Sequence, residues 1–161
     1  MIYRPYNMPI LRPITIPTQG LGFFKRYKNW LFGIRQWEVM EDWTYTLRSG
    51  RQIFIPAGYI FNGASIPRIF WGILSPTGIL LIPALPHDFA YEYGWVWMIG
   101  KDGVKEKFGK GIERKYWDDL FMQMAIRVNG FKVINKIARF GLFIGSKWAW
   151  NKHRKNDTDE T

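Results

Sequence analysis

The sequence contains no cysteine, and this absence excludes three kinds of site. A chain without thiols cannot form disulfide bonds, thiolate metal sites or a cysteine nucleophile. Histidine is also scarce, because only His87 and His153 are present and they lie far apart in the sequence. A single histidine among scattered carboxylates is a poor zinc ligand set, so we expect no bound zinc and no other resident cofactor.

A long unbroken apolar run is missing as well. The longest uncharged stretch, residues 69–86, is about as long as a membrane span, but prolines and a glycine interrupt it at positions 76, 78, 83 and 86. The start of the chain lacks the charged segment and continuous apolar run of a signal peptide. We therefore expect no transmembrane segment and a protein that is made in the cytoplasm.

Acidic residues are few: 13 Asp and Glu stand against 23 Lys and Arg, which gives a net charge of +10. The excess is uneven, because residues 101–155 hold 14 basic residues against 5 acidic ones. Such a charge suits nucleic acid, an anionic membrane or an acidic protein, and an ordinary lysine-rich helix surface would look the same. Recognisable nucleic-acid motifs are absent, so we expect only weak, salt-sensitive contact with nucleic acid or anionic membranes.

Aromatic residues, in contrast, are abundant. They make up 18% of the chain and include nine tryptophans. In one domain, rings at this density fill the core and leave others to cover a partner surface.

The chain divides into an extended arm, one domain and a tail. Prolines at positions 5, 9, 13 and 17 predict an extended arm over residues 1–21, which either docks on a neighbouring subunit or packs on its own domain. We expect this arm to add little to folding. Residues 22–152 are predicted to form a single domain, and the charged residues 153–161 a disordered tail.

The first part of the domain has strand and turn signals. Alternating bulky and polar residues around "RSGR" predict a hairpin that pairs residues 37–47 with residues 51–56. Ser65 as the N-cap and Pro67 in the first turn predict a short helix to about residue 74, followed by a turn at "SPTG".

The second part has mostly helical signals. Residues 79–93 are predicted to be helical, with prolines at 83 and 86 that bend the helix or delay its start to about residue 83. Five glycines in residues 94–111 indicate a loop or a small β excursion. Residues 112–130 predict a helix that stops at Asn129-Gly130, and residues 131–152 a last helix. The predicted fold class is α+β, with a small antiparallel β portion packed on three to four helices.

The segment "ALPHDFAYEYG" at residues 84–94 carries the most distinctive chemical motif. On a helix, His87 and Tyr91 share a face, while Asp88 turns about 100° aside. A later helix carries Asp118 and Asp119 in "WDDLFMQMA". His87, Asp88, Tyr91 and Asp118 are therefore candidates for a catalytic set, but we favour a buried hydrogen-bonded pin that holds two helices together.

These blocks, preceded by "IFIPAGYIFNGASIPRIFW" and "SPTG", occur in an order that resembles the domain-of-unknown-function family numbered 1353, which is found in bacteriophages and prophages. The resemblance covers about residues 35–150. The matching positions are Asn62, Ser65, Pro67, Arg68, His87, Asp88, Tyr91, Asp118 and Phe121. Asn62 stands where family members usually have an Asp, so it keeps a hydrogen-bonding group and loses the charge.

The His-Asp-x-x-Tyr block also resembles the centre of secretory phospholipases of the A-two type. That resemblance implies His87 as the general base and Asp88 as a calcium ligand. It further implies that Asp118 or Asp119 orients the imidazole with support from Tyr91. The disulfides and the plain calcium loop of those enzymes are missing here, and Asp88 alone supplies too few of the roughly six to eight oxygens that calcium takes.

The proline-rich arm, the surplus of aromatic residues and the incomplete catalytic set favour binding over turnover. We expect a bacteriophage structural or virion-associated protein of the tail, neck or head-tail region that binds other virion proteins. One alternative is a phage-encoded hydrolase of lipid or envelope bonds that uses His87 and calcium. Another is a nucleic-acid-binding or host-modulating accessory protein.

Overall fold

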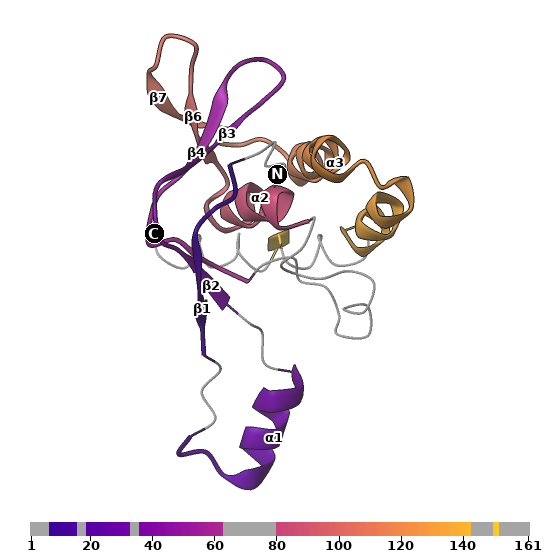
Figure 1. Cartoon of the computed structure of the whole chain (residues 1–161). Coiled ribbons are helices and arrows are strands. Elements are labelled where there is room, and N and C mark those ends of the chain that lie inside the picture. Colours follow the sequence, from indigo (N-terminus) through magenta and orange to yellow (C-terminus); the bar gives the residue numbers. More distant parts are fainter. Residues whose placement is uncertain (1–6, 16–18, 33–35, 63–79, 143–149, 152–161) are drawn as a thin grey trace, which may run out of the picture.

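The computed structural model describes residues 7–15, 19–32, 36–62, 80–142 and 150–151 of the chain (Figure 1). Its elements are β1 (Leu11–Ile14), α1 (Phe23–Phe32), β2 (Gln36–Val39), β3 (Trp43–Thr46), β4 (Gln52–Ile55), β5 (Ile60–Phe61), α2 (Leu81–Tyr93), β6 (Val96–Ile99), β7 (Lys105–Phe108) and α3 (Arg114–Asn129). Residues 132–142 and 150–151 are also helical. The predicted α+β class, with a small antiparallel β portion and a few helices, is confirmed.

The strands form two antiparallel sheets, with the orders β1-β2-β5 and β3-β4-β6-β7. Strand β4 shows why such short segments are strands. Ile53 and Ile55 are buried, while Gln52 and Phe54 on the opposite face are only half-buried. This alternation with a period of two places one face of the sheet on the core.

The predicted hairpin is right for residues 43–46, which pair with residues 52–55 in the register Trp43 to Ile55. It is wrong for residues 37–39, which belong to the other sheet. The chain turns a corner between β2 and β3. At this corner, Asp42 Oδ1 accepts a hydrogen bond from the Ala57 amide at 2.9 Å. The amide of Gly58, which has a positive φ of 81°, donates to the carbonyl of Val39 at 2.7 Å. The chain therefore leaves one sheet after Val39 and enters the next at Trp43.

The described part of the N-terminal arm packs on its own chain. Strand β1 pairs with β2, and Pro13 is tolerated there because β1 lies at the edge of its sheet. Just before β1, the Trp43 indole donates to the carbonyl of Asn7 at 2.7 Å, and the Met40 amide donates to the carbonyl of Ile10 at 2.9 Å. Of the two arrangements expected for the arm, these residues adopt the intramolecular one.

The second sheet is completed by a hairpin between β6 and β7 within residues 94–111. The turn is closed by a hydrogen bond from the Gly103 amide to the carbonyl of Gly100, at 3.1 Å. The β excursion expected in this glycine-rich region is therefore present, and it extends the sheet that begins with β3 and β4.

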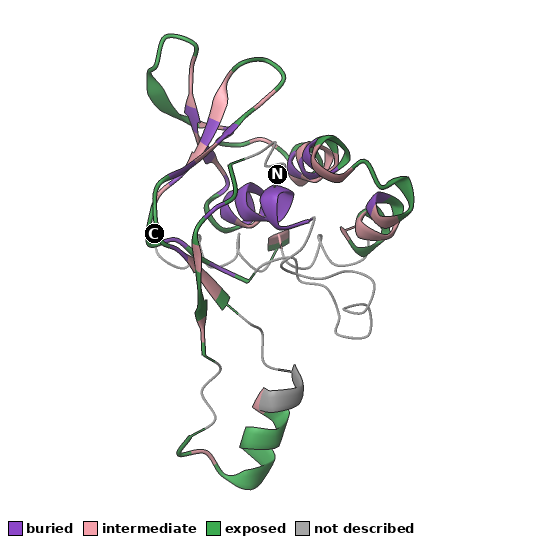
Figure 2. Cartoon of the chain, in the orientation of Figure 1, coloured by how far each residue is buried: buried purple, intermediate pink, exposed green. Residues whose placement is uncertain are grey.

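Helix α2 crosses the centre of the molecule and is buried along most of its length (Figure 2). It begins at Leu81, so Pro83 does not delay the start of the helix to residue 83. A proline in the first turn costs little, because its missing amide would have had no intrahelical partner. Pro86, in contrast, lies inside the helix. Gly94 ends α2 with a φ of 73°, and its amide donates to the carbonyl of Ala90.

Helix α3 packs against α2, and its predicted end is confirmed. Gly130 has a φ of 65°, and its amide donates to the carbonyl of Ile126 at 3.1 Å. The main core lies between α2 and the strands, where Trp43, Leu85 and Trp117 are almost fully buried. A smaller apolar cluster joins α2 and α3 to residues 132–142.

Several predictions concern residues outside the described part of the chain. These are the short helix from Ser65 to about residue 74, the turn at residues 75–78, the middle of the last helix and the charged tail 153–161. In the part that is described, no helix is long and apolar enough to cross a membrane.

Candidate functional site

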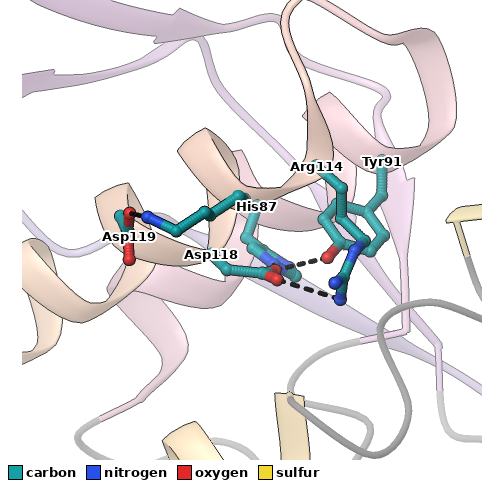
Figure 3. A network of polar contacts seen from close by, with 6 residues as sticks. His87, Tyr91, Arg114, Asp118 and Asp119 are labelled. Atoms are coloured by element: carbon teal, nitrogen blue, oxygen red, sulfur yellow. Dashed lines mark hydrogen bonds and ion pairs between the residues drawn. The ribbon is translucent and has the colours of Figure 1, made fainter.

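The candidate site lies between helices α2 and α3, which pack against each other (Figure 3). His87 and Tyr91 stand one turn apart on α2, as their spacing predicts, and their ring centroids are 4.1 Å apart. Asp118 projects from α3 toward both of them. The structure thus brings Asp118 to His87 and Tyr91, although Asp118 follows His87 by 31 residues and Tyr91 by 27 residues in the sequence.

Asp118 is the centre of the hydrogen-bond network. Its Oδ1 lies 3.0 Å from His87 Nε2 and also accepts a hydrogen bond from the Tyr91 hydroxyl. Its Oδ2 accepts a hydrogen bond from Arg114 Nη1 at 3.2 Å, one turn earlier on α3. Both oxygens of the carboxylate are therefore occupied, and the negative charge is shared between a histidine, a tyrosine and an arginine.

Asp88 lies on the other side of the imidazole. Its Oδ1 is 3.9 Å from His87 Nδ1, so each ring nitrogen faces a carboxylate. When His87 is protonated, both nitrogens carry hydrogen, and the two carboxylates stabilise the resulting positive charge. Asp88 follows His87 directly on α2 and is turned about 100° aside, and its carboxylate lies beside Nδ1 rather than Nε2.

The network is largely withdrawn from solvent. Relative exposure is 8% for His87 and 4% for Tyr91. Phe121 approaches the imidazole edge-on at 5.3 Å, and Trp150 approaches the Tyr91 ring in the same manner, also at 5.3 Å. A hollow on the described surface lies elsewhere, between the two hairpins of the second sheet, where Ser49, Asp102 and Glu106 line it.

The contacts within the site shift the pKa values of His87 and Asp118 in opposite directions. Burial alone would lower the pKa of His87, but its hydrogen bonds to Asp118 and Asp88 outweigh burial and raise that pKa above 6.5. Burial likewise would raise the pKa of Asp118, but the hydrogen bonds from His87 and Tyr91 and the charges of His87 and Arg114 lower it below 3.8. The network therefore favours an imidazolium paired with a carboxylate.

The described residues do not fit a calcium or zinc site. Nowhere in the described ranges do three or more His, Asp or Glu side chains come close enough to hold a metal ion. Asp88 Oδ1 lies beside the imidazole, and both oxygens of the Asp118 carboxylate already accept hydrogen bonds. His153 lies outside the described residues. We therefore derive no catalytic step through a metal.

The structure resolves the choice between Asp118 and Asp119, and it also places Asn62. Asp118, and not Asp119, meets the imidazole, because Asp119 points to solvent and pairs with Lys115 at 3.0 Å. Asn62 hydrogen-bonds to Gln36 Nε2 at 3.3 Å, at the sheet of β1, β2 and β5. The other family positions before the histidine, Ser65, Pro67 and Arg68, lie outside the described residues.

Sequence reasoning missed Arg114. It stands four residues before Asp118, a spacing that brings opposite charges together on one helix face and could have signalled the pair.

The chain matches the model of a family described as "Protein of unknown function (DUF1353)" over residues 37–139. It belongs to the DUF1353 family. The matched region contains the whole second sheet and the whole His87 network, while β1 and α1 lie before it. The resemblance seen in the sequence blocks is confirmed at the level of the family. No curated protein and no solved structure matches this DUF1353 protein.

Proposed function

We propose that this DUF1353 protein is a structural component of a bacteriophage virion, in the tail, neck or head-tail region, and that it acts by binding other virion proteins. The bacteriophage origin rests on the resemblance of its sequence blocks to prophage-encoded members of the family. The binding role rests on one observation. Large apolar side chains remain on the surface at the end of α3 and in the helix that follows it, including Ile126, Phe131, Val133 and Phe140, each more than half exposed.

The His87 network supports this proposal because its polar groups are used inside the protein. The Asp118 carboxylate joins α2 to α3 through His87 and Tyr91, and Arg114 binds its second oxygen. Such a network fixes how the two helices pack and leaves few buried polar groups unsatisfied. In this role, the network holds the scaffold that presents the exposed side chains.

The proposal is tested by mass spectrometry of purified virions from the phage or prophage that encodes the protein. We expect the protein in the particles at a fixed ratio to a known tail or head-tail component. Detection in infected cells together with its absence from purified particles would exclude a virion role.

A second candidate function is hydrolysis of lipid or envelope ester bonds, and the orientation of the imidazole favours it. Asp118 holds Nε2, which is how a carboxylate orients a histidine so that the opposite nitrogen takes a proton from water. In this mechanism, His87 Nδ1 accepts the proton, and Asp118 stabilises the imidazolium that forms. Asp88, 3.9 Å from Nδ1, would hold the attacking water in place.

This second candidate is tested with phospholipid and short-chain ester substrates, each assayed with and without calcium. Hydrolysis by the wild type that His87→Ala abolishes, and that rises with pH as the imidazolium loses its proton, would establish it. A wild type without hydrolysis on either substrate would leave His87 with its structural role.

A further inference from the structure

Helix α1 extends away from the rest of the protein. It connects β1 to β2, and Figure 1 shows it beyond the ends of these two strands, on the opposite side from the β6–β7 hairpin. Residues 23–28 of α1 are exposed, and residue 29 is half-buried (Figure 2). In a globular protein, a helix of this length is ordinarily stabilised by packing an apolar face on a core.

The exposed side chains of α1 are aromatic. Phe24 is 86% exposed, Phe23 77% and Tyr27 54%. Residues 23 and 27 are one turn apart, and residue 24 lies beside them, so the three rings share one side of the helix. Phe23 and Phe24 contact each other edge-on at 5.8 Å. Leaving this area of ring surface in water is unfavourable, which indicates that something covers it when the protein works.

The other side of α1 is basic. Lys25, Arg26 and Lys28 are exposed, and the sequence of the helix, "FFKRYKNWLF", contains no acidic residue. Residues 25 and 28 are separated by three positions and point away from the side that carries Phe23 and Tyr27. An aromatic side and a basic side on one short helix are typical of helices that lie in the interface of a membrane.

We propose that α1 docks on the surface of an anionic lipid bilayer, with Phe23, Phe24 and Tyr27 in the interfacial region and Lys25 and Lys28 beside the lipid phosphates. The aromatic rings settle at the headgroup level, where ring surface leaves water. The lysines add electrostatic attraction to anionic lipids. A second copy of α1 fits this surface less well, because two such helices would bring six positive charges together and no negative ones.

This inference does not depend on the proposed virion role, because α1 contributes neither to the His87 network nor to the exposed apolar side chains of residues 126–140. The test uses the full-length protein and two kinds of vesicle, phosphatidylcholine alone and phosphatidylcholine mixed with phosphatidylglycerol. Binding is measured by flotation with the vesicles. We expect the wild type to float with the anionic vesicles, to float poorly with the neutral ones, and to detach as salt is added.

Two double variants separate the contributions of rings and charges. Phe23→Ser with Phe24→Ser should lower the partition coefficient on anionic vesicles by at least about tenfold. Lys25→Gln with Lys28→Gln should lower it by about thirtyfold, roughly fivefold for each lysine, and leave the weak binding to neutral vesicles unchanged. The matched control is Val104→Ser in the β6–β7 loop, a residue that is 59% exposed and should not change binding.

Two outcomes would overturn the proposal. One is a wild type that floats with neither kind of vesicle, or with both equally. The other is a concentration-dependent dimer, seen by light scattering, that the phenylalanine variant dissociates, because a second copy would then cover the aromatic surface. Circular dichroism of each variant must match the wild type, so that a loss of binding is not a loss of folding.

Discussion

At the scale of single residues, the pin between α2 and α3 makes a direct prediction about stability. His87 is only 8% exposed, and its Nε2 pairs with Asp118 Oδ1. His87→Ala removes this contact. We expect the free energy of unfolding to fall by about 1 to 3 kcal/mol, because the Asp118 carboxylate loses one charge-assisted hydrogen bond and keeps only those from Tyr91 and Arg114. The measurement is urea denaturation followed by circular dichroism.

The control for His87→Ala is Asp119→Asn on the same helix. Asp119 pairs with Lys115 at the surface, where an ion pair contributes at most about 1 kcal/mol. An equal loss of stability in both variants would mean that the His87 network does not hold the helices together.

The same network makes stability depend on pH. Because the pKa of His87 is raised in the folded state, its contribution is complete below pH 6.5 and is lost as pH rises through the raised value. The pKa of Asp118 is lowered, so its contribution is present above pH 3.8 and is lost as pH falls through the lowered value. We expect the two contributions together to be largest between about pH 4 and 6.5.

Urea denaturation of the wild type and of His87→Gln, from about pH 4 to well above the raised pKa of His87, checks the prediction. The wild type should lose stability above pH 6.5, and the variant should show a weaker loss there. Parallel curves for the two proteins would assign the pH dependence to other groups.

A glycine beside the core allows another comparison at this scale. A Cβ built on Gly109 would lie 2.5 Å from the Trp117 ring, and the φ of Gly109 is +100°. Gly111 has a φ of +77° but no atom within 4 Å of such a Cβ. We expect Gly111→Ala to cost about 1 kcal/mol from its backbone and Gly109→Ala clearly more, measured by thermal unfolding. Equal costs would mean that Trp117 moves aside easily.

At the scale of elements, local signals predicted more than distant ones. The ends of α2 and α3 were readable because a glycine with positive φ stops each helix, at Gly94 and Gly130. The pairing of β2 with β1 and β5 was not readable, because these strands are two to four residues long and their partners lie far away in the sequence. In such short strands, the alternation pattern cannot show which sheet a segment joins.

The candidate site was predictable for a related reason. His87 and Tyr91 are fixed on one face by helix periodicity alone, and only the approach of Asp118 required the packing of two helices. The rotation of α3 about its axis decides whether Asp118 or Asp119 contacts His87. The sequence does not determine that rotation. The position of Asp88 beside Nδ1 likewise follows from the rotation of α2.

Strand β1 changes what we expect of the N-terminal arm. It pairs with β2 over four residues, and the carbonyl of Asn7 accepts a hydrogen bond from the buried Trp43. The sequence predicts an arm that adds little to folding. Because deleting residues 1–14 removes these contacts, we expect a lower melting temperature instead. The comparison is a calorimetric scan of the full chain and the truncated chain, and identical melting temperatures would mean that β1 contributes nothing to folding.

At the scale of the whole molecule, the count of 23 Lys and Arg overstates the number of basic groups available to a partner. Ion pairs occupy Arg51 with Glu106 and Lys115 with Asp119. Lys105 and Lys107 lie over aromatic rings of the second sheet, at 4.2 Å from the Phe54 centroid and 4.3 Å from the Trp95 centroid. In the described part of the chain, these basic side chains are therefore spread over different elements, each with its own local partner.

This distribution leads to a prediction about nucleic acid. A protein that places few cations on one stretch of backbone releases few counterions, so its affinity is low and is lost at moderate salt. We expect mixed-sequence duplex DNA to bind weakly at low salt, measured by fluorescence anisotropy, and the slope of log affinity against log salt to correspond to only a few phosphate contacts. The control is Lys105→Gln with Lys107→Gln, which should lower that slope by about two if the second sheet makes the contact. Sequence-selective binding that persists at moderate salt would contradict the spread of charge seen here and would make nucleic acid, rather than protein or lipid, the partner to pursue.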